Sequence, residues 1–135
     1  MTKTVAHIEK VLGVANSTSA AALSRLAASW RRSADKHGLD PGEHRGPRRL
    51  ESTHLRERID AFDKLMTEAA PRLDNLYSLV GQSGCAVLLT DDDGVVLDQR
   101  ISSADTAVFE AWGLCVGADW SERHEGTNGI GTCLA

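Results

Sequence analysis

Apolar residues recur in steps of four and three along residues 55–80, the strongest hydrophobic pattern in the chain. This spacing is typical of a heptad seam on one face of a helix. The seam comprises Leu55, Ile59, Phe62, Met66, Ala69, Leu73, Leu76 and Val80. Proline removes one intrahelical donor, so Pro71 predicts a kink or a break near Ala70. The pattern predicts a helix that packs on the chain's own sheet or forms the seam of a homodimer.

A shorter amphipathic stretch precedes this seam. Its apolar positions follow helical spacing and comprise Leu23, Leu26, Ala27, Trp30 and Ala34. Ser17 or Ser19 can cap the start of this helix, and Trp30 is interpreted as a packing anchor. Residues 1–18 are weakly patterned and predict a frayed terminus. Residues 38–50 are rich in glycine and proline and predict a loop or linker.

Two apolar runs, residues 85–90 and 95–100, predict the strands of a hairpin. Residues 91–94 read Asp-Asp-Asp-Gly, which suits a tight turn with glycine at the position of positive φ. The three aspartates lack the alternating spacing of a calcium loop. A further helix over residues 105–112, capped by Ser102 or Ser103, follows the hairpin. These elements predict an α+β fold with an antiparallel sheet.

In residues 120–135, a tryptophan, acidic residues and a histidine precede a Gly-Thr-Asn-Gly-Ile-Gly-Thr stretch at residues 126–132. Thr127 or Asn128 can accept from the amides two or three residues on, as a helix N-cap does. Gly126, Gly129 and Gly131 permit positive φ or a close approach to another element. We expect a tight loop that places a helix beneath the sheet. Because that helix would be only about one turn long, the sheet and the unit are expected to be incomplete.

Composition places the chain among ordinary soluble globular proteins. It has 135 residues, of which 41% are hydrophobic and 25% charged, and the net charge is −4. We expect a cytoplasmic protein, because no apolar run could span a membrane and no signal peptide begins the chain. Residues 1–50 hold nine Lys or Arg against four acidic residues. This basic stretch has little aromatic interleaving and no recognisable reading helix, so direct nucleic-acid binding is not expected.

Candidate chemistry is sparse. Cys85, Cys115 and Cys133 are odd in number and contain no Cys-x-x-Cys pair, which favours reduced thiols. Cys115, His124 and Cys133 fit no zinc-ligand spacing, so no metal site is predicted. The start of a helix could activate the Cys133 thiol, although its apolar setting favours burial. Neither a phosphate-binding loop nor a catalytic constellation is present, and no cofactor is expected.

Seven segments together resemble a known family over nearly the whole chain. They are residues 29–33, 38–41, 70–73, 88–91, 94–97, 120–122 and 126–132. In this order and approximate spacing they are similar to the N-terminal region and the first half of the GAF domain of sigma-54-dependent activators of the acetoin and glycerol catabolism type. The resemblance implies an N-terminal helical segment over residues 1–50 and a partial GAF-like sensor domain over residues 51–135.

The resemblance implies a regulatory module that senses a small molecule and is not an enzyme. Its ligand, anionic or carbonyl-bearing, would lie between the sheet and the terminal loop. The candidate binding residues there are Trp120, Glu122, Thr127 and Asn128. The signal would pass through a homodimer formed by the 55–80 helix. Two alternatives remain, which are a cysteine-based redox sensor or methionine sulfoxide reductase and a ligand-free dimerisation scaffold.

Overall fold

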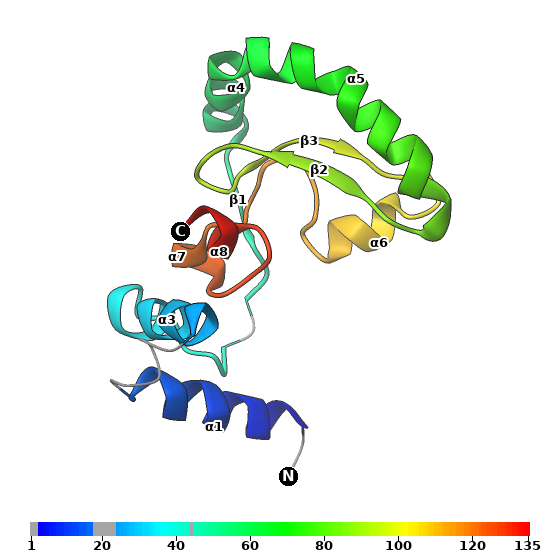
Figure 1. The fold of residues 1–135 in the computed structure, drawn as a ribbon. Coiled ribbons are helices and arrows are strands. Elements are labelled where there is room, and N and C mark those ends of the chain that lie inside the picture. Colours follow the sequence, from blue (N-terminus) through cyan, green and yellow to red (C-terminus); the bar gives the residue numbers. More distant parts are fainter. Residues whose placement is uncertain (1–2, 18–23, 44) are drawn as a thin grey trace. The chain divides into compact units, whose positions relative to one another are not determined.

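The computed structural model describes residues 3–17, 24–43 and 45–135 (Figure 1). These residues form two compact units, which are described separately. Unit 1 comprises Met1–Gly46 together with Trp120–Ala135, and unit 2 comprises Pro47–Asp119. The predicted domain boundary at residue 50 stays a prediction, because compactness alone does not define a domain. Within the described residues no helix has the length and apolar character needed to cross a membrane.

Unit 1 is helical. Its elements are α1 (Lys3–Ala15), α3 (Arg25–Arg31), the π-helical turn η1 (Arg32–Lys36), α7 (Glu122–Glu125) and α8 (Gly131–Leu134). The expectation of a frayed start is wrong for residues 3–15, because α1 packs against α3 and buries Val11 and Ala15. Ser24 caps α3, its hydroxyl accepting from the Ala27 amide at 3.4 Å. Of the residues predicted for this helix, Ser19 and Leu23 lie outside the described residues.

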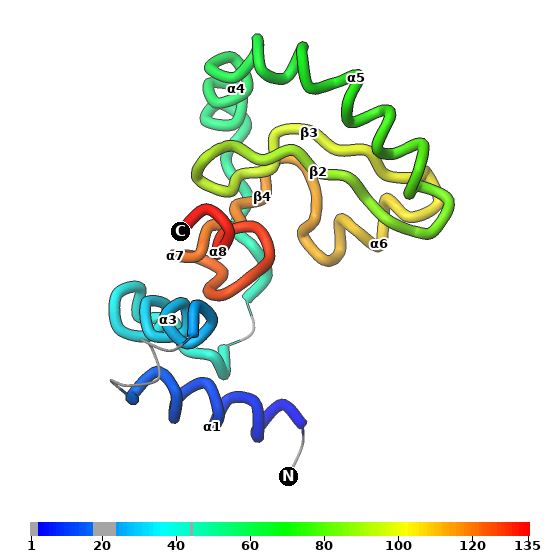
Figure 2. Tube along the Cα trace, in the orientation of Figure 1, coloured from blue at the N-terminus to red at the C-terminus, as the bar shows by residue number. Residues whose placement is uncertain are grey.

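Unit 2 contains two small antiparallel sheets (Figure 2). One pairs β1 (Arg48–Arg49) with β4 (Ala118–Asp119), and the other pairs β2 (Val87–Thr90) with β3 (Val96–Arg100). The second sheet is the predicted hairpin, and Gly94 in its turn has a φ of 96° as expected. The core gathers around this hairpin, where Val95, Val96 and Leu97 are buried. The α+β expectation is therefore confirmed at the level of a mixed helical and antiparallel structure.

The predicted 55–80 helix is two helices, α4 (Ser52–Ala61) and α5 (Asp63–Val80). The chain leaves helical geometry at Phe62, with φ −106° and ψ 10°. No break occurs near Ala70, because Pro71 lies inside a continuous α5, and the alternative of a kink there stays a prediction. A tertiary contact holds the last turn of α4. The Arg58 guanidinium donates to Asp91 at 2.5 Å and to Asp93 at 2.9 Å.

Helix α5 covers one face of the β2–β3 hairpin (Figure 1). Leu73 is buried there, Met66 and Val80 are half-buried, and Leu76 is exposed. Much of the predicted seam therefore packs on the sheet of its own unit. A short 3-10 turn, η2 (Gly81–Ser83), connects α5 to the hairpin.

Helix α6 (Thr106–Ala111) follows the hairpin where the sequence predicts a helix. The Ser102 hydroxyl accepts from the Asp105 amide at 3.2 Å in the turn before α6. The N-cap itself is Asp105, without a side-chain capping bond, so the expected cap by Ser102 or Ser103 is wrong. Gly113, with a φ of 72°, ends this segment. The apolar side of α6 does not form core, because Val108 is 46% and Trp112 is 61% exposed.

Candidate functional site

A buried carboxylate organises unit 1. Glu122 lies at the start of α7, and its side chain is only 5% exposed. Arg32 of η1 donates from Nε to one carboxylate oxygen at 2.8 Å and from Nη2 to the other at 3.1 Å. The Ser29 hydroxyl of α3 donates to the same carboxylate at 2.6 Å. Residues about ninety positions apart in sequence thus join the N-terminal helices to the terminal loop.

The neighbours of Glu122 keep its carboxyl group ionised. Burial by itself raises the pKa of a carboxyl group, because desolvation penalises the charged form. Hydrogen bonds from Arg32, Ser29 and Thr132 outweigh that effect, and the pKa of Glu122 lies below its ordinary value. The pKa of Arg32 is raised chiefly by its hydrogen bond to the same carboxylate. The group is therefore a buried ion pair at neutral pH, not a proton donor.

Asn128 shapes the terminal loop. Its Oδ1 accepts from the amides of Ile130 at 2.9 Å and Gly131 at 2.8 Å, which confirms the predicted capping interaction. Its Nδ2 donates to the carbonyls of Trp120 at 3.0 Å and Gly126 at 2.9 Å. Both ends of the amide are engaged within the loop. Asn128 therefore orders the backbone here.

Two of the three loop glycines behave as expected. Gly126 has a φ of 65°, in the left-handed region that disfavours a side chain. A Cβ on Gly131 would collide with the backbone of Trp120 and Glu122, so this glycine permits close packing. Gly129 does neither, because it lies in open space and has no positive φ. Within unit 1 the loop contacts α3 and α7, and its expected placement beneath the sheet stays a prediction.

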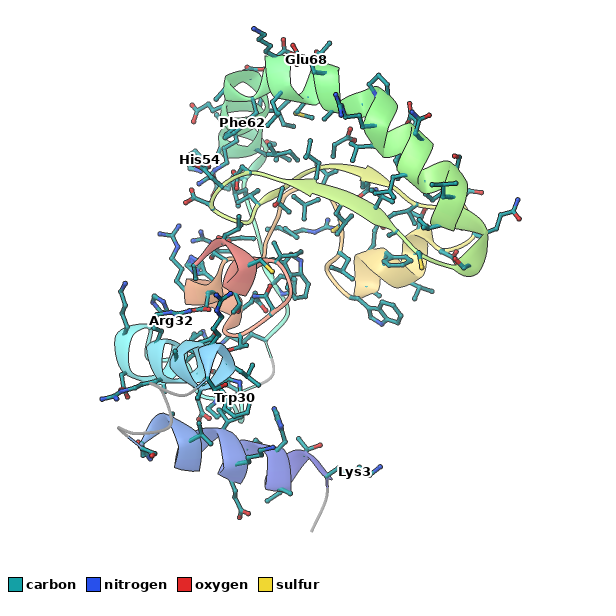
Figure 3. The ribbon with its side chains drawn as sticks, in the orientation of Figure 1. Lys3, Trp30, Arg32, His54, Phe62 and Glu68 are labelled. Atoms are coloured by element: carbon teal, nitrogen blue, oxygen red, sulfur yellow. The ribbon has the colours of Figure 1, made fainter. Side chains whose placement is uncertain are left out.

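A pocket of about 450 Å³ lies within unit 1. Its apolar wall includes Val11 of α1, Trp30 of α3 and Leu39. Trp30 lies between α3 and α1, and the ring of His7 meets it edge-on at a centroid distance of 6.1 Å (Figure 3). Gly126 approaches the pocket without a side chain. The loop and two N-terminal helices thus enclose a space of the size that small organic ligands occupy.

The remaining lining of this pocket is polar. Ser33 lines it, together with three acidic side chains, one arginine and three histidines. These charged residues and histidines are Asp40, Glu43, Glu125, Arg45, His7, His37 and His124. Ser33 is 9% exposed, and its hydroxyl has no hydrogen-bond partner among the described residues. A buried hydroxyl without a partner is costly unless something else satisfies it. This wall of the pocket therefore carries unused hydrogen-bonding capacity.

The residues that line this pocket all belong to unit 1, and none lies in a strand. The expected pocket between the sheet and the loop stays a prediction. Of the four candidate binding residues, Thr127 lines the pocket of unit 1, and its hydroxyl lies 2.6 Å from that of Ser29. Trp120, Glu122 and Asn128 do not line it, and their ligand contacts stay predictions. Sequence reasoning missed Ser33 and assigned Trp30 to packing, although both lie in the 29–33 segment that carries the family resemblance.

The cysteines are dispersed. Cys115 is buried beside the Arg49 guanidinium, whereas Cys85 and Cys133 are exposed. The expected burial of Cys133 is wrong, because α8 leaves this side chain on the surface. Among the described residues, no cluster of three His, Cys, Asp or Glu side chains could hold a metal ion.

Comparison with known proteins identifies the class. The chain is 39% identical over 107 residues to the acetoin catabolism regulatory protein of Cupriavidus necator, an alignment that covers 79% of the chain and 16% of that protein. It is 35% identical over 112 residues, 82% of the chain and 18% of the relative, to the acetoin dehydrogenase operon transcriptional activator AcoR of Bacillus subtilis. It is 36% identical over 117 residues to the propane 2-monooxygenase operon transcriptional activator MimR of Mycolicibacterium smegmatis, covering 84% of the chain and 18% of that activator.

All three relatives are named as regulators or activators, and the chain spans less than a fifth of the length of each. The chain is thus related to a class of regulatory N-terminal regions of transcriptional activators. It belongs to the family described as MimR, N-terminal domain, whose model matches residues 2–135. No solved structure matches the chain.

Proposed function

We propose that this chain is the small-molecule-sensing region of a cytoplasmic, sigma-54-dependent transcriptional activator. The observation that carries the proposal is the pocket of unit 1, in which the N-terminal helices and the terminal loop enclose the unpartnered hydroxyl of Ser33. The names of the relatives support a regulatory role and not an enzymatic one. In this proposal the segment with β2 and β3 belongs to a GAF-like sheet.

The charges of the pocket favour a neutral or cationic polar ligand over an anion. Three acidic side chains and one arginine line it, and that arginine, Arg45, pairs with Glu43 at 2.5 Å. By formal charge, with three carboxylates against one arginine, the lining is acidic, which opposes a carboxylate or phosphate. The Trp30 face offers apolar contact, and the polar side chains of the lining offer hydrogen bonds. A compact polar organic molecule fits this combination.

A bound ligand would act through packing. The Glu122–Arg32 pair and the Ser29–Thr127 contact fasten the terminal loop to α3, beside the pocket wall. A ligand that fills the pocket binds more tightly when the loop is held in this position, so it stabilises that state. We further propose that the chain forms a homodimer through the α4–α5 segment and that the change in packing reaches the partner subunit there.

Melting temperature and fluorescence test the sensing proposal. The chain is titrated with short amines, diols, ketones and carboxylates, and a ligand is expected to raise the melting temperature by mass action. The accompanying change in tryptophan fluorescence is expected to disappear in Trp30→Phe and to persist in Trp112→Phe, because Trp112 lies on the exposed side of α6. An unchanged melting temperature with every compound, or a signal that survives Trp30→Phe, would overturn the proposal.

The exposed thiol of Cys133 favours a second candidate, a redox sensor. An accessible thiolate can be oxidised reversibly, and oxidation at α8 would disturb the loop that encloses the pocket. Peroxide should then shift the melting temperature of the wild-type chain and not that of Cys133→Ser. An equal response in both proteins would exclude this candidate.

A further inference from the structure

Helix α5 presents two apolar faces. The inner face packs on the hairpin through residues such as Met66 and Leu73. The outer stripe carries three leucines that the unit leaves uncovered, since Leu65 is 50%, Leu76 is 49% and Leu79 is 81% exposed. These positions are eleven and three residues apart, so they align on one side of a helix with 3.6 residues per turn.

Two opposite charges lie within this stripe. Glu68 and Arg72 fall between Leu65 and Leu76, and both side chains are exposed. Neither forms an ion pair with any residue that the structure describes. Glu68 points away from the hairpin at the outer side of α5 (Figure 3). The stripe therefore combines exposed apolar side chains with two side chains of opposite charge that form no ion pair among the described residues.

The order of these residues is self-complementary. When two copies of α5 lie antiparallel about a two-fold axis near residue 70, Leu65 of one copy comes opposite Leu76 of the other. Glu68 then comes opposite Arg72, and the same pairs recur on the other side of the axis. Ala69 borders the stripe close to the axis, and its small side chain permits a close approach of the two backbones. Parallel alignment would instead bring Glu68 against Glu68 and Arg72 against Arg72.

We propose that the outer stripe of α5, defined as Leu65, Glu68, Arg72, Leu76 and Leu79, binds the same stripe of a second copy in antiparallel orientation. This inference deepens the homodimer of the proposed function and rests on it. It replaces the predicted seam with a neighbouring set of residues. The more buried positions of α5, Met66, Leu73 and Val80, stay on the side of the hairpin, while the outward residues form the contact. Charge complementarity selects the second copy as occupant, because an unrelated apolar partner would not need both charges in this order.

Charge reversal tests the pairing. Sedimentation equilibrium is run in reducing buffer at about 0.1–1 mM chain, since a contact formed by one helix lies at the small, weak end of protein interfaces. Glu68→Arg alone and Arg72→Glu alone each place like charges opposite one another twice, and each is expected to raise the Kd about tenfold. The double variant restores opposite charges and is expected to return the Kd to within about threefold of wild type. Lys64→Glu, an exposed reversal off the stripe, is the matched control and should leave the Kd unchanged.

The outcomes separate this inference from the sensing proposal. A monomeric wild-type chain over this concentration range overturns the antiparallel pair and the homodimer. A dimer that both single reversals leave unchanged overturns the pair alone, because another surface must hold it. If the single reversals weaken the dimer and the double variant does not restore its Kd, the antiparallel register is also overturned. The ligand-dependent rise in melting temperature is measured on Glu68→Arg as well, since the pocket belongs to unit 1 and should respond in the monomer.

Discussion

The buried ion pair of unit 1 offers the sharpest test of how the terminal loop is held. Arg32→Met removes the guanidinium and keeps a flexible apolar stem of similar reach. The Glu122 carboxylate, 5% exposed, then keeps hydrogen bonds such as that from Ser29 but loses its cation. The adjacent Arg31→Met is the matched control. Arg31 pairs with Asp35 at 3.2 Å in an i,i+4 arrangement in which both side chains are exposed.

The expected costs differ several-fold. Removing one partner of a buried pair costs about 3–5 kcal/mol of unfolding free energy. Because the Arg32 side chain is 38% exposed, the expected cost is lower, about 2–3 kcal/mol. Breaking an exposed i,i+4 pair costs about 0.3–0.5 kcal/mol. For a chain of this size, about 4 °C of melting temperature corresponds to 1 kcal/mol. Arg32→Met should therefore melt about 10 °C below wild type, and Arg31→Met about 2 °C below.

Thermal unfolding followed by circular dichroism and calorimetry at neutral pH measures both changes. The pH dependence adds a second readout. Because the pKa of folded Glu122 is lowered, its contribution is present above the ordinary pKa of about 4.5 and is lost as the pH falls through the folded value. Arg32→Met should weaken this acid sensitivity. Equal melting temperatures for Arg32→Met and Arg31→Met would refute the reasoning that the buried carboxylate depends on Arg32.

Two further predictions concern the backbone of each unit. Gly131→Ala forces a Cβ into the backbone of residues 120–122 and should cost about 2–3 kcal/mol, whereas Gly129→Ala, in open space, should change the free energy of unfolding by less than about 1 kcal/mol. Comparable urea midpoints for these two variants would contradict the close approach. Asp91→Asn replaces a buried carboxylate that accepts from the Val95 amide at 2.9 Å and pairs with Arg58. The variant should lose about 2 kcal/mol of unfolding free energy. The exposed Asp92→Asn is its control, and an equal loss in both would show that the hairpin turn does not depend on Asp91.

Local rules explain the parts of the fold that the sequence predicts well. The alternation of strands and turn residues identifies the hairpin, and Gly94 takes its positive φ. The Asn128 side chain accepts from the Gly131 amide at the start of α8, as short polar side chains at helix starts do. In each case the decisive partners lie within a few residues along the chain. Neighbouring residues are sufficient to predict such features.

The errors arise where distant contacts decide between local possibilities. The heptad pattern runs through Phe62, but α4 ends there, and Arg58 in its last turn pairs with the hairpin turn. Residues 3–15 have too weak a pattern to predict a helix, and packing against α3 supplies the missing stabilisation. Propensity is a weak guide wherever tertiary packing can override it.

The sequence alone therefore determines the α+β composition, the hairpin, the Asn128 turn and the family. Only the tertiary structure joins Ser29 and Arg32 to Glu122 and encloses a pocket between the N-terminal helices and the terminal loop. The physical reason is that a buried charge needs a partner of opposite sign but does not specify where along the chain that partner lies. Ninety residues separate Arg32 from Glu122. No periodic pattern in the sequence spans that distance, so only the folded structure shows that these two residues pair.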